Sequence, residues 1–414
     1  MTVPDTRVFI AFDLAAGGSG DFFTLDDPVK GRLGGGTVVG AFTLAGDILQ
    51  DVTSDVMSLS VRRGRSRQLE EFQAGAAAIV LDNSQRKFDP AAGTAITPYG
   101  ASMRPRKQVV VESNGQRVFT GVVDDWDLDY SLDGDHKTTV DAVDGFVELA
   151  GQVLDSFTAS SQLSGARVDA ILNRPEVSWT GGRDVDSGLA TLQADVVSAD
   201  GPQNVLEYLQ EVEKSEPGAL YVGADGVLTF RDRGDLQSPS AVEFRDDGAG
   251  IPFTNIRVAY GSEELRNRAT VSILNGGTAT AEASSSVAAY GPIDFVLQDL
   301  LLSTTGQAQT LADWLVNAYA EPKLRVDQLE VNLAGLTVQQ VNDVLGLELA
   351  DVIFVRFQPS GIGDPVEAYA AIDSIEHSVE PLRHIVRFDL SSTTAGFILD
   401  SDVFGVLDVS ILGF

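Results

Sequence analysis

Two of the three histidines in this 414-residue chain are spaced so that they could act together. His377 and His384 lie on either side of a Glu-Pro pair, and a hairpin there would bring the two imidazoles close to each other. Together with Glu376 they offer the kinds of ligand that zinc accepts. Histidines that satisfy only local hydrogen bonds are far commoner than metal sites. We therefore expect no metal and no cofactor; the third histidine, His136, lies apart in an Asp-rich turn.

An acidic run around Trp126 is the second candidate for chemistry. Carboxylates such as those in residues 124–129 suit a glycosidase or a calcium site. The stretch Asp129–Gly134 begins like a calcium loop, but the twelfth position holds Val140 where a bidentate Glu is needed. Apolar and acidic residues alternate along the run, which predicts a half-buried strand with an acidic outer face.

The motifs of the large enzyme classes are missing from the sequence. It has no cysteine, no phosphate-binding loop ending in Gly-Lys-Ser/Thr, no His-Glu-x-x-His and no Gly-x-Ser-x-Gly. The glycine clusters at 17–20 and 34–36 lack the dinucleotide-binding spacing, and we interpret them as loops. We expect a protein that is not an enzyme. A cell-wall hydrolase with a carboxylate pair is the alternative, which zymography on wall material would detect.

Four arginines within six residues form one prominent basic cluster. Arginine makes bidentate contacts with carboxylates and is well suited to protein interfaces. In so acidic a chain, the partner of the cluster could be a second copy of the chain, and nucleic acid is a weaker interpretation. We expect these residues at an intersubunit contact, so that reversing all four to Glu blocks assembly and leaves the monomer folded. They are Arg62, Arg63, Arg65 and Arg67.

The charge of the chain argues against two classes of partner. The sequence has 60 acidic and 29 basic residues, a net charge of −31. Sequence-specific binding of nucleic acid and binding to anionic membranes both need basic surface, and neither is expected. No apolar run approaches the ~20 residues of a membrane span, and no secretory signal is visible, so we expect synthesis in the cytoplasm without a membrane anchor. Residues 1–120 hold 13 basic and 13 acidic residues, so all the net charge lies beyond them.

Residues 1–150, which contain the arginine cluster and the acidic run, are expected to form mostly strands. The clearest signal is a hairpin over Val109–Val123, because Asn114-Gly115 suits a type I′ turn. Pairing across that turn sets Glu112 opposite Arg117. The same register sets Val110 opposite Phe119, and Val111 opposite Val118. Several short strands separated by turn signals predict a β-barrel or sandwich.

The middle of the chain changes from a strand pattern to a helix pattern. Residues 151–240 contain two helix patterns, the first over Ser164–Asn173 and the second opening near Asp200. A hairpin follows that turns at Asp225-Gly226 and sets Tyr221 opposite Phe230. These patterns predict a small α/β domain between two β-rich domains.

Strands return in residues 241–395 around one strong helix, which Thr305 can cap and Pro322 ends. Residues 396–414 then form an apolar segment that is too short to have a core of its own. We expect this C-terminal segment to dock on a neighbour or a partner. Its candidate docking side chains are Phe404, Leu407, Leu412 and Phe414.

A series of short strings runs along most of the chain, with the fewest in residues 151–240. The strings are Val61–Arg67, Leu69, Phe72–Gly75, Leu81–Asn83, Arg86–Pro90, Asn267–Val271, Ala288–Gly291, Ala312–Leu315, Tyr319–Pro322 and Gly405–Asp408. No single string is diagnostic, but their order and spacing are fairly specific. In that order they resemble the minor tail proteins of long-tailed, siphovirus-type actinobacterial phages.

The resemblance implies a baseplate hub at the tail tip of the virion. The fold it implies is mainly β: two β-barrel domains of the tail-hub type, at 1–150 and 241–395, flank the α/β insertion at 151–240. It also implies a homotrimer that joins a sixfold ring of distal tail protein to a threefold central fibre around the DNA-ejection channel. The implied partners are other copies of the chain, the distal tail protein, the tape measure protein, and the central fibre or other minor tail proteins.

Two other functions stay open at this point. A hexameric distal tail protein would use one barrel per chain, whereas this sequence predicts two β-rich blocks. A receptor-binding tail-tip adhesin could stack sugars on its tryptophans, which are Trp126, Trp179 and Trp314. A glycan pull-down would separate the adhesin from the two ring proteins.

Overall fold

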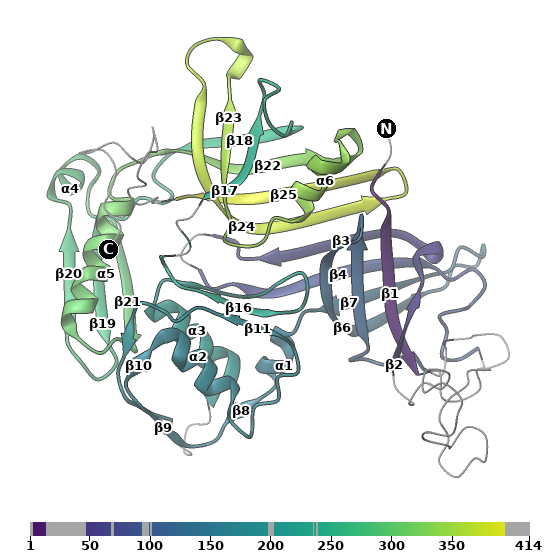
Figure 1. Cartoon of the computed structure of the whole chain (residues 1–414), viewed down its shortest axis with the longest axis horizontal. Helices are drawn as coiled ribbons and strands as arrows, with labels where there is room; N and C mark the ends of the chain where they lie inside the picture. The colour runs from purple at the N-terminus through teal and green to yellow at the C-terminus, as the bar shows by residue number, and fades with distance from the viewer. Residues whose placement is uncertain are drawn as a thin grey trace, which may run out of the picture.

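The computed structural model describes residues 3–13, 47–67, 70–92, 99, 102–197, 203–234, 236 and 239–393. Strands dominate the chain, as the sequence predicts (Figure 1). Within these residues no helix is both long and apolar enough to cross a membrane. The predicted docking segment at 396–414, with Phe404, Leu407, Leu412 and Phe414, lies outside the described residues.

Thirteen of the described strands join into one large sheet. Seven of them form an N-terminal block: β1 (Thr6–Asp13), β2 (Asp47–Asp51), β3 (Val56–Gly64), β4 (Gln73–Asp82), β5 (Gln108–Ser113), β6 (Gln116–Asp129) and β7 (Lys137–Val143). The other six form a C-terminal block with helix α6 (Val338–Leu345): β17 (Pro239–Arg245), β18 (Asn255–Tyr260), β22 (Leu324–Asn332), β23 (Val352–Phe357), β24 (Val366–Glu380) and β25 (Arg383–Ser392).

The two blocks meet where β3 pairs antiparallel with β24. This pairing sets Arg63 opposite Ile375 and Val61 opposite His377. The hydrogen-bonded path through the described strands runs from β18 at one edge to β2 at the other, so it is open. The expectation of two separately closed barrels is therefore not met by these strands. The physical reason is that β3 uses one edge for β4 and the other for β24, which joins the blocks.

One hydrophobic core serves both blocks of the sheet. Ile79 and Phe119 of the N-terminal block are fully buried in the same cluster as Phe244 and Phe388 of the C-terminal block. Buried apolar surface stabilises a fold by about 25 cal/mol per Å². Because the two blocks share this surface, separating them would expose part of the core of each.

The β5–β6 hairpin forms at the predicted turn, but its register differs in part. Asn114 and Gly115 both have positive φ, and Glu112 lies opposite Arg117 as predicted. The pairs further from the turn are shifted by one residue, because a β-bulge between Val111 and Glu112 places Val111 opposite Phe119. The predictions that set Val110 opposite Phe119 and Val111 opposite Val118 were therefore wrong, and Val110 lies opposite Thr120.

An α/β insertion follows the N-terminal block. Its second long helix begins at Val205, where the Asn204 side chain caps it by accepting hydrogen bonds from two backbone amides. Its later hairpin sets Tyr221 opposite Thr229, one residue from the prediction. The elements are α1 (Phe146–Ala150), β8 (Val153–Leu154), β9 (Phe157–Ala159), β10 (Gln162–Leu163), α2 (Ser164–Leu172), β11 (Arg183–Val185), β12 (Thr191–Leu192), β13 (Asp195–Val197), β14 (Gln203–Asn204), α3 (Val205–Ser215), β15 (Ala219–Val222) and β16 (Leu228–Arg231).

A three-stranded sheet covered by a helix shares the core of this insertion. Tyr208 and Leu209 of the insertion lie in the same cluster as Val271 and Leu315. This cluster joins residues from both sides of the boundary that the sequence sets at 240. The added elements are β19 (Arg268–Ile273), β20 (Thr278–Glu282), α4 (Ser284–Tyr290), β21 (Asp294–Leu300) and α5 (Thr305–Tyr319).

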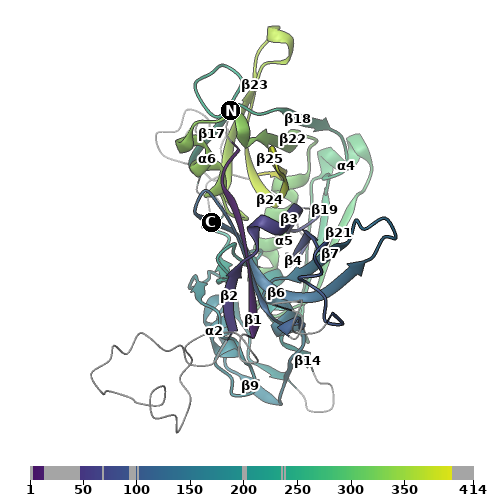
Figure 2. The same ribbon diagram turned by 90° about the vertical axis from the view of Figure 1, so that its right-hand side faces the viewer.

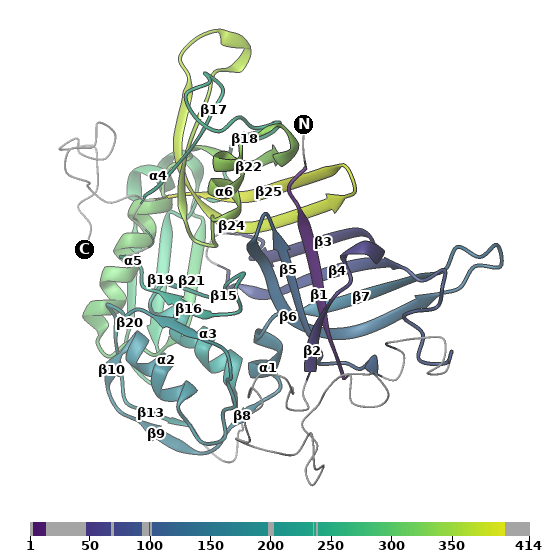
Figure 3. The same cartoon turned by 45° about the vertical axis from the view of Figure 1, so that its right-hand side comes forward.

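The pictures agree on how these parts are arranged. The β23–β24 hairpin projects at one end of the molecule and the insertion lies at the other (Figures 1 and 2). The N-terminal block forms one side, and α5 with the β19–β21 sheet forms the opposite side (Figure 3). Two arginines of the cluster, Arg62 and Arg63, lie at the end of β3, and Arg65 and Arg67 lie just after it.

Candidate functional site

The arginine cluster divides into an inner and an outer pair. Arg63 and Arg65, the inner arginines, are held inside the chain, and their side chains are 3% and 15% exposed. Arg62 and Arg67, the outer arginines, are 55% and 70% exposed. The guanidinium groups of the outer arginines are therefore the most exposed of the cluster.

Arg63 ties three parts of the chain together. Its Nη1 donates to Oε1 of Glu348 at 2.5 Å, and the other oxygen of Glu348 accepts from the backbone N–H of Ala224 at 2.9 Å. Arg63 belongs to β3, Glu348 precedes β23, and Ala224 lies in the β15–β16 turn. The ion pair therefore links the two sheet blocks and the insertion.

Arg65 forms a second link between the sheet blocks. Its Nε donates to Oδ1 of Asp373 on β24 at 2.7 Å, and its guanidinium lies 4.6 Å from the centre of the Phe72 ring. Gly64 makes this approach possible. Its φ is +119°, and a Cβ there would lie 2.2 Å from the carbonyl oxygen of Asp373. A glycine inside the cluster is thus needed to bring β3 against β24.

A buried carboxyl supports the same junction from the insertion side. Asp144 accepts hydrogen bonds from the backbone N–H groups of Gly75 at 2.6 Å and Phe146 at 3.0 Å. Burial raises the pKa of Asp144 to about 6, and the nearby Arg63 opposes that rise. This side chain fixes β4 to the start of α1.

With the described residues, the outer arginines form long ion pairs. Arg62 lies 3.7 Å from Asp389, and Arg67 lies 3.9 Å from Glu263. Exposed pairs of this kind contribute about 0–1 kcal/mol to stability. An intersubunit role of the cluster stays a prediction. The exposed side chains of Arg62 and Arg67 are compatible with it.

The histidine pair has the geometry that the sequence predicts, without a metal ligand set. Nδ1 of His377 lies 3.1 Å from Nε2 of His384, and Nδ1 of His384 lies 3.4 Å from Oγ of Ser113. Burial lowers the pKa of both imidazoles, to about 4 for His384, so both are neutral at pH 7. Glu376 pairs with Arg387 instead. Among the described side chains, no three His, Cys, Asp or Glu gather to hold a metal ion.

The acidic run is the half-buried strand that its alternation predicts. On β6, Trp126 and Leu128 are partly buried while Asp127 and Asp129 are exposed. The indole of Trp126 packs near Phe12, with ring centres 6.1 Å apart. The run therefore contributes apolar side chains to the core that the two sheet blocks share, and it presents a negatively charged outer face.

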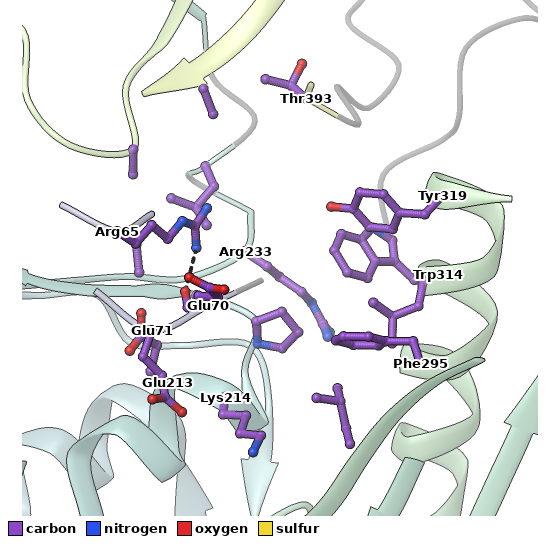
Figure 4. Close-up of a pocket in the computed structure, with 18 of the residues that line it drawn as sticks. Arg65, Glu70, Glu71, Glu213, Lys214, Arg233, Phe295, Trp314, Tyr319 and Thr393 are labelled. Atoms are coloured by element: carbon purple, nitrogen blue, oxygen red, sulfur yellow. Dashed lines mark hydrogen bonds between the residues drawn. The ribbon is translucent and has the colours of Figure 1, made fainter. Parts of the chain in front are cut away.

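A pocket that the sequence did not reveal adjoins the arginine junction. It has a volume of about 550 Å³, and its walls come from the loop after β3, the end of α3, β21, α5 and the residue after β25. Phe295, Trp314 and Tyr319 form one side, and Arg65 and Glu213 lie on the opposite side (Figure 4). Residues so distant in sequence carry no common motif, which is why spacing alone could not find the pocket.

Glu213 gives the pocket a buried carboxyl with spare hydrogen-bonding capacity. It is 4% exposed, and its Oε1 accepts from the backbone N–H of Leu220 at 3.0 Å. Its Oε2 has no hydrogen-bond partner within the described part of the chain. Burial raises the pKa of Glu213 to about 8, so the neutral acid dominates at pH 7. The pocket thus combines an aromatic wall with a neutral polar group.

Comparison with known proteins gives a result at the level of fold. No protein-family model and no curated protein matches the chain. The 43 kDa tail protein of prophage MuSo2 from Shewanella oneidensis matches 84% of this chain and 95% of its own, with a TM-score of 0.55 and 14% identity. The tail protein from Neisseria meningitidis MC58 matches 83% of this chain and 93% of its own, with a TM-score of 0.56 and 11% identity.

Prophage tail protein gp18 from Listeria monocytogenes EGD-e is similar too, over 84% of this chain and 92% of its own, with a TM-score of 0.50 and 12% identity. The chain has the fold of these phage tail proteins. The predicted relationship to phage tails is confirmed to that extent. The assignment to actinobacterial, siphovirus-type phages stays a prediction.

Proposed function

We propose that this chain is a structural, non-enzymatic protein of a phage tail, and that it forms the baseplate hub at the tail tip. The observation that carries the proposal is the similarity in fold to tail proteins along nearly their whole length. A shared fold alone does not fix a function, so the hub role rests on the arrangement of this chain's own parts as well.

Two strand blocks in one chain favour a hub over a ring protein with one β unit. Three copies would place six strand blocks around a channel, three N-terminal and three C-terminal. Such a ring can lie on a sixfold ring of distal tail protein and still present threefold symmetry to a central fibre. The tape measure protein and other minor tail proteins are the further partners that this position implies.

The charge of the chain suits a channel for DNA. Like charges repel, so a ring with acidic walls would let DNA pass without binding it. The net charge of −31 and the exposed carboxylates of β6 support this part of the proposal.

Copy number per virion tests the proposal. We expect three copies per purified particle, measured by quantitative mass spectrometry against the tail-tube protein. Six copies would instead favour the hexameric distal tail protein. Absence from purified particles would contradict a role in the virion tail altogether.

A further inference from the structure

The pocket beside the arginine junction runs along an exposed strand edge. Among the described strands, β21 has one hydrogen-bonded neighbour, β19. Three consecutive residues of β21 line the pocket: Phe295, Val296 and Leu297. Successive side chains of a strand point to opposite faces. The cavity touches residues of both kinds, so it runs along β21.

The last described residue of the chain, Thr393, lies at this pocket. Thr393, which directly follows β25, is itself a lining residue of the pocket and lies across from Trp314 and Tyr319 in Figure 4. Four residues of extended chain span at most about 13 Å. Phe397 of the same molecule can therefore reach the pocket from Thr393.

The residues that follow have the composition of a strand for an apolar site. Phe397, Ile398 and Leu399 are consecutive, and Asp400 and Asp402 come after them. An exposed strand edge beside apolar pockets is a common acceptor of an extended peptide, since main-chain hydrogen bonds and alternate side chains are both satisfied. The basic side chains of Lys214 and Arg233 at the pocket can meet Asp400.

We propose that residues 394–400 of the same chain dock in this pocket as an added strand along β21. Phe397 and Leu399 then lie on the face of Phe295 and Leu297, against the aromatic wall. Ile398 lies on the other face, beside Val296, which is 50% exposed in the described structure.

The docking assigns one occupant to the pocket and does not depend on the hub function. It concerns the purified chain alone, so a test of it succeeds or fails independently of the copy number in virions.

Disulfide trapping tests the proposal in the full chain. The sequence has no cysteine, so two introduced cysteines are the only ones present. Val296→Cys with Ile398→Cys is the test pair. Val338→Cys with Ile398→Cys is the matched control, because Val338 is 71% exposed on α6 and does not line the pocket. Mild oxidation is followed by mass spectrometry of the linked peptides in the monomer.

We expect the test pair to form an intrachain disulfide about tenfold faster than the control pair, and Phe397→Ser with Leu399→Ser to abolish that advantage. Equal rates in the two pairs, or no disulfide in the test pair, would overturn the proposal. Disulfides between two molecules would overturn it as well, because the occupant would then be a second copy.

A second measurement needs no cysteine. Trp314 is the one tryptophan that lines the pocket, so docking shields it from solvent. Phe397→Ser with Leu399→Ser in the otherwise unchanged chain should increase the quenching of tryptophan fluorescence by acrylamide. An unchanged quenching constant would contradict the docking.

Discussion

The inner and outer arginines are the same residue type within six positions, yet the structure uses them in opposite ways. Arg63 is buried against Glu348, whereas its neighbour Arg62 is exposed and 3.7 Å from Asp389. The difference comes from the strand: successive side chains of β3 point to opposite faces of the sheet. A charged cluster on a strand is therefore divided by the pleat, one part toward the interior and one toward solvent.

Gly64, the last residue of β3, separates the inner Arg65 from the outer Arg67 in a second way. Its positive φ turns the chain against β24, so Arg65 reaches Asp373 and Phe72. Arg67 lies past this turn and returns to solvent. Composition alone predicts one surface with four equivalent arginines; the backbone produces two inside a junction and two outside it.

Removing an inner arginine is expected to have the largest effect. Arg63→Met leaves Glu348 without its cation at a largely buried site, which should lower the free energy of unfolding by about 3 kcal/mol. Urea denaturation measures this change. Arg62→Met is the matched control, and its effect should stay within about 0.5 kcal/mol. Equal losses in the two variants would break the distinction between inner and outer arginines.

The junction also corrects the four-arginine reversal proposed from the sequence. Arg63→Glu would place a carboxylate against Glu348, and Arg65→Glu would place one against Asp373. Like charges in a buried site are strongly unfavourable. The reversal of all four residues would therefore unfold the monomer, and its failure to assemble would say nothing about an interface.

The buried carboxyl of Glu213 should make the stability of the fold depend on pH. The folded-state pKa of Glu213 is about 8, above its ordinary value of 4.5, so the folded chain binds this proton more tightly than the unfolded chain. The contribution of Glu213 to stability is thus complete below about pH 4.5 and is lost as the pH rises to about 8. Glu213→Gln removes this dependence and should be more stable than the wild type at pH 9 by about 1–2 kcal/mol.

Denaturation at pH 5 and at pH 9 measures the difference. The control is Glu71→Gln, since Glu71 lines the same pocket but is less buried than Glu213. A wild-type stability that does not fall between these pH values, or a Glu71→Gln variant that behaves like Glu213→Gln, would contradict the assignment to the buried carboxyl.

Local patterns of the sequence predicted the elements well, and contacts between distant elements poorly. The Asn114-Gly115 turn, the apolar face of α3 and the helix before Pro322 all follow from spacing within a few residues. The bulge at Val111 and the capping of α5 by Thr304 in place of Thr305 changed details by one residue. These are small errors because local chemistry decides them.

The junction and the pocket were beyond local reasoning. Arg63 contacts Glu348, which lies 285 residues away in the sequence, and no rule of residue spacing predicts that pair. The pairing of β3 with β24 decides it, and that pairing depends on a register over the whole sheet. Sequence reasoning found the arginine cluster because of its composition. It could not tell which arginines turn inward.

The smallest effect on stability, and the sharpest test of the outer pair, is expected from Arg62→Glu with Arg67→Glu. Both side chains are exposed, and their ion pairs with described residues are long, so the double variant should unfold within about 0.5–1 kcal/mol of the wild type. If these arginines meet an acidic partner in the tail, the folded variant will be lost from virions, as measured by mass spectrometry of purified particles. Arg104→Glu with Arg106→Glu, which changes the charge equally, is the control. Normal incorporation of the outer-pair variant would exclude the outer arginines from the interface, and since the inner pair is already engaged within the chain, it would remove the cluster from the assembly surface altogether.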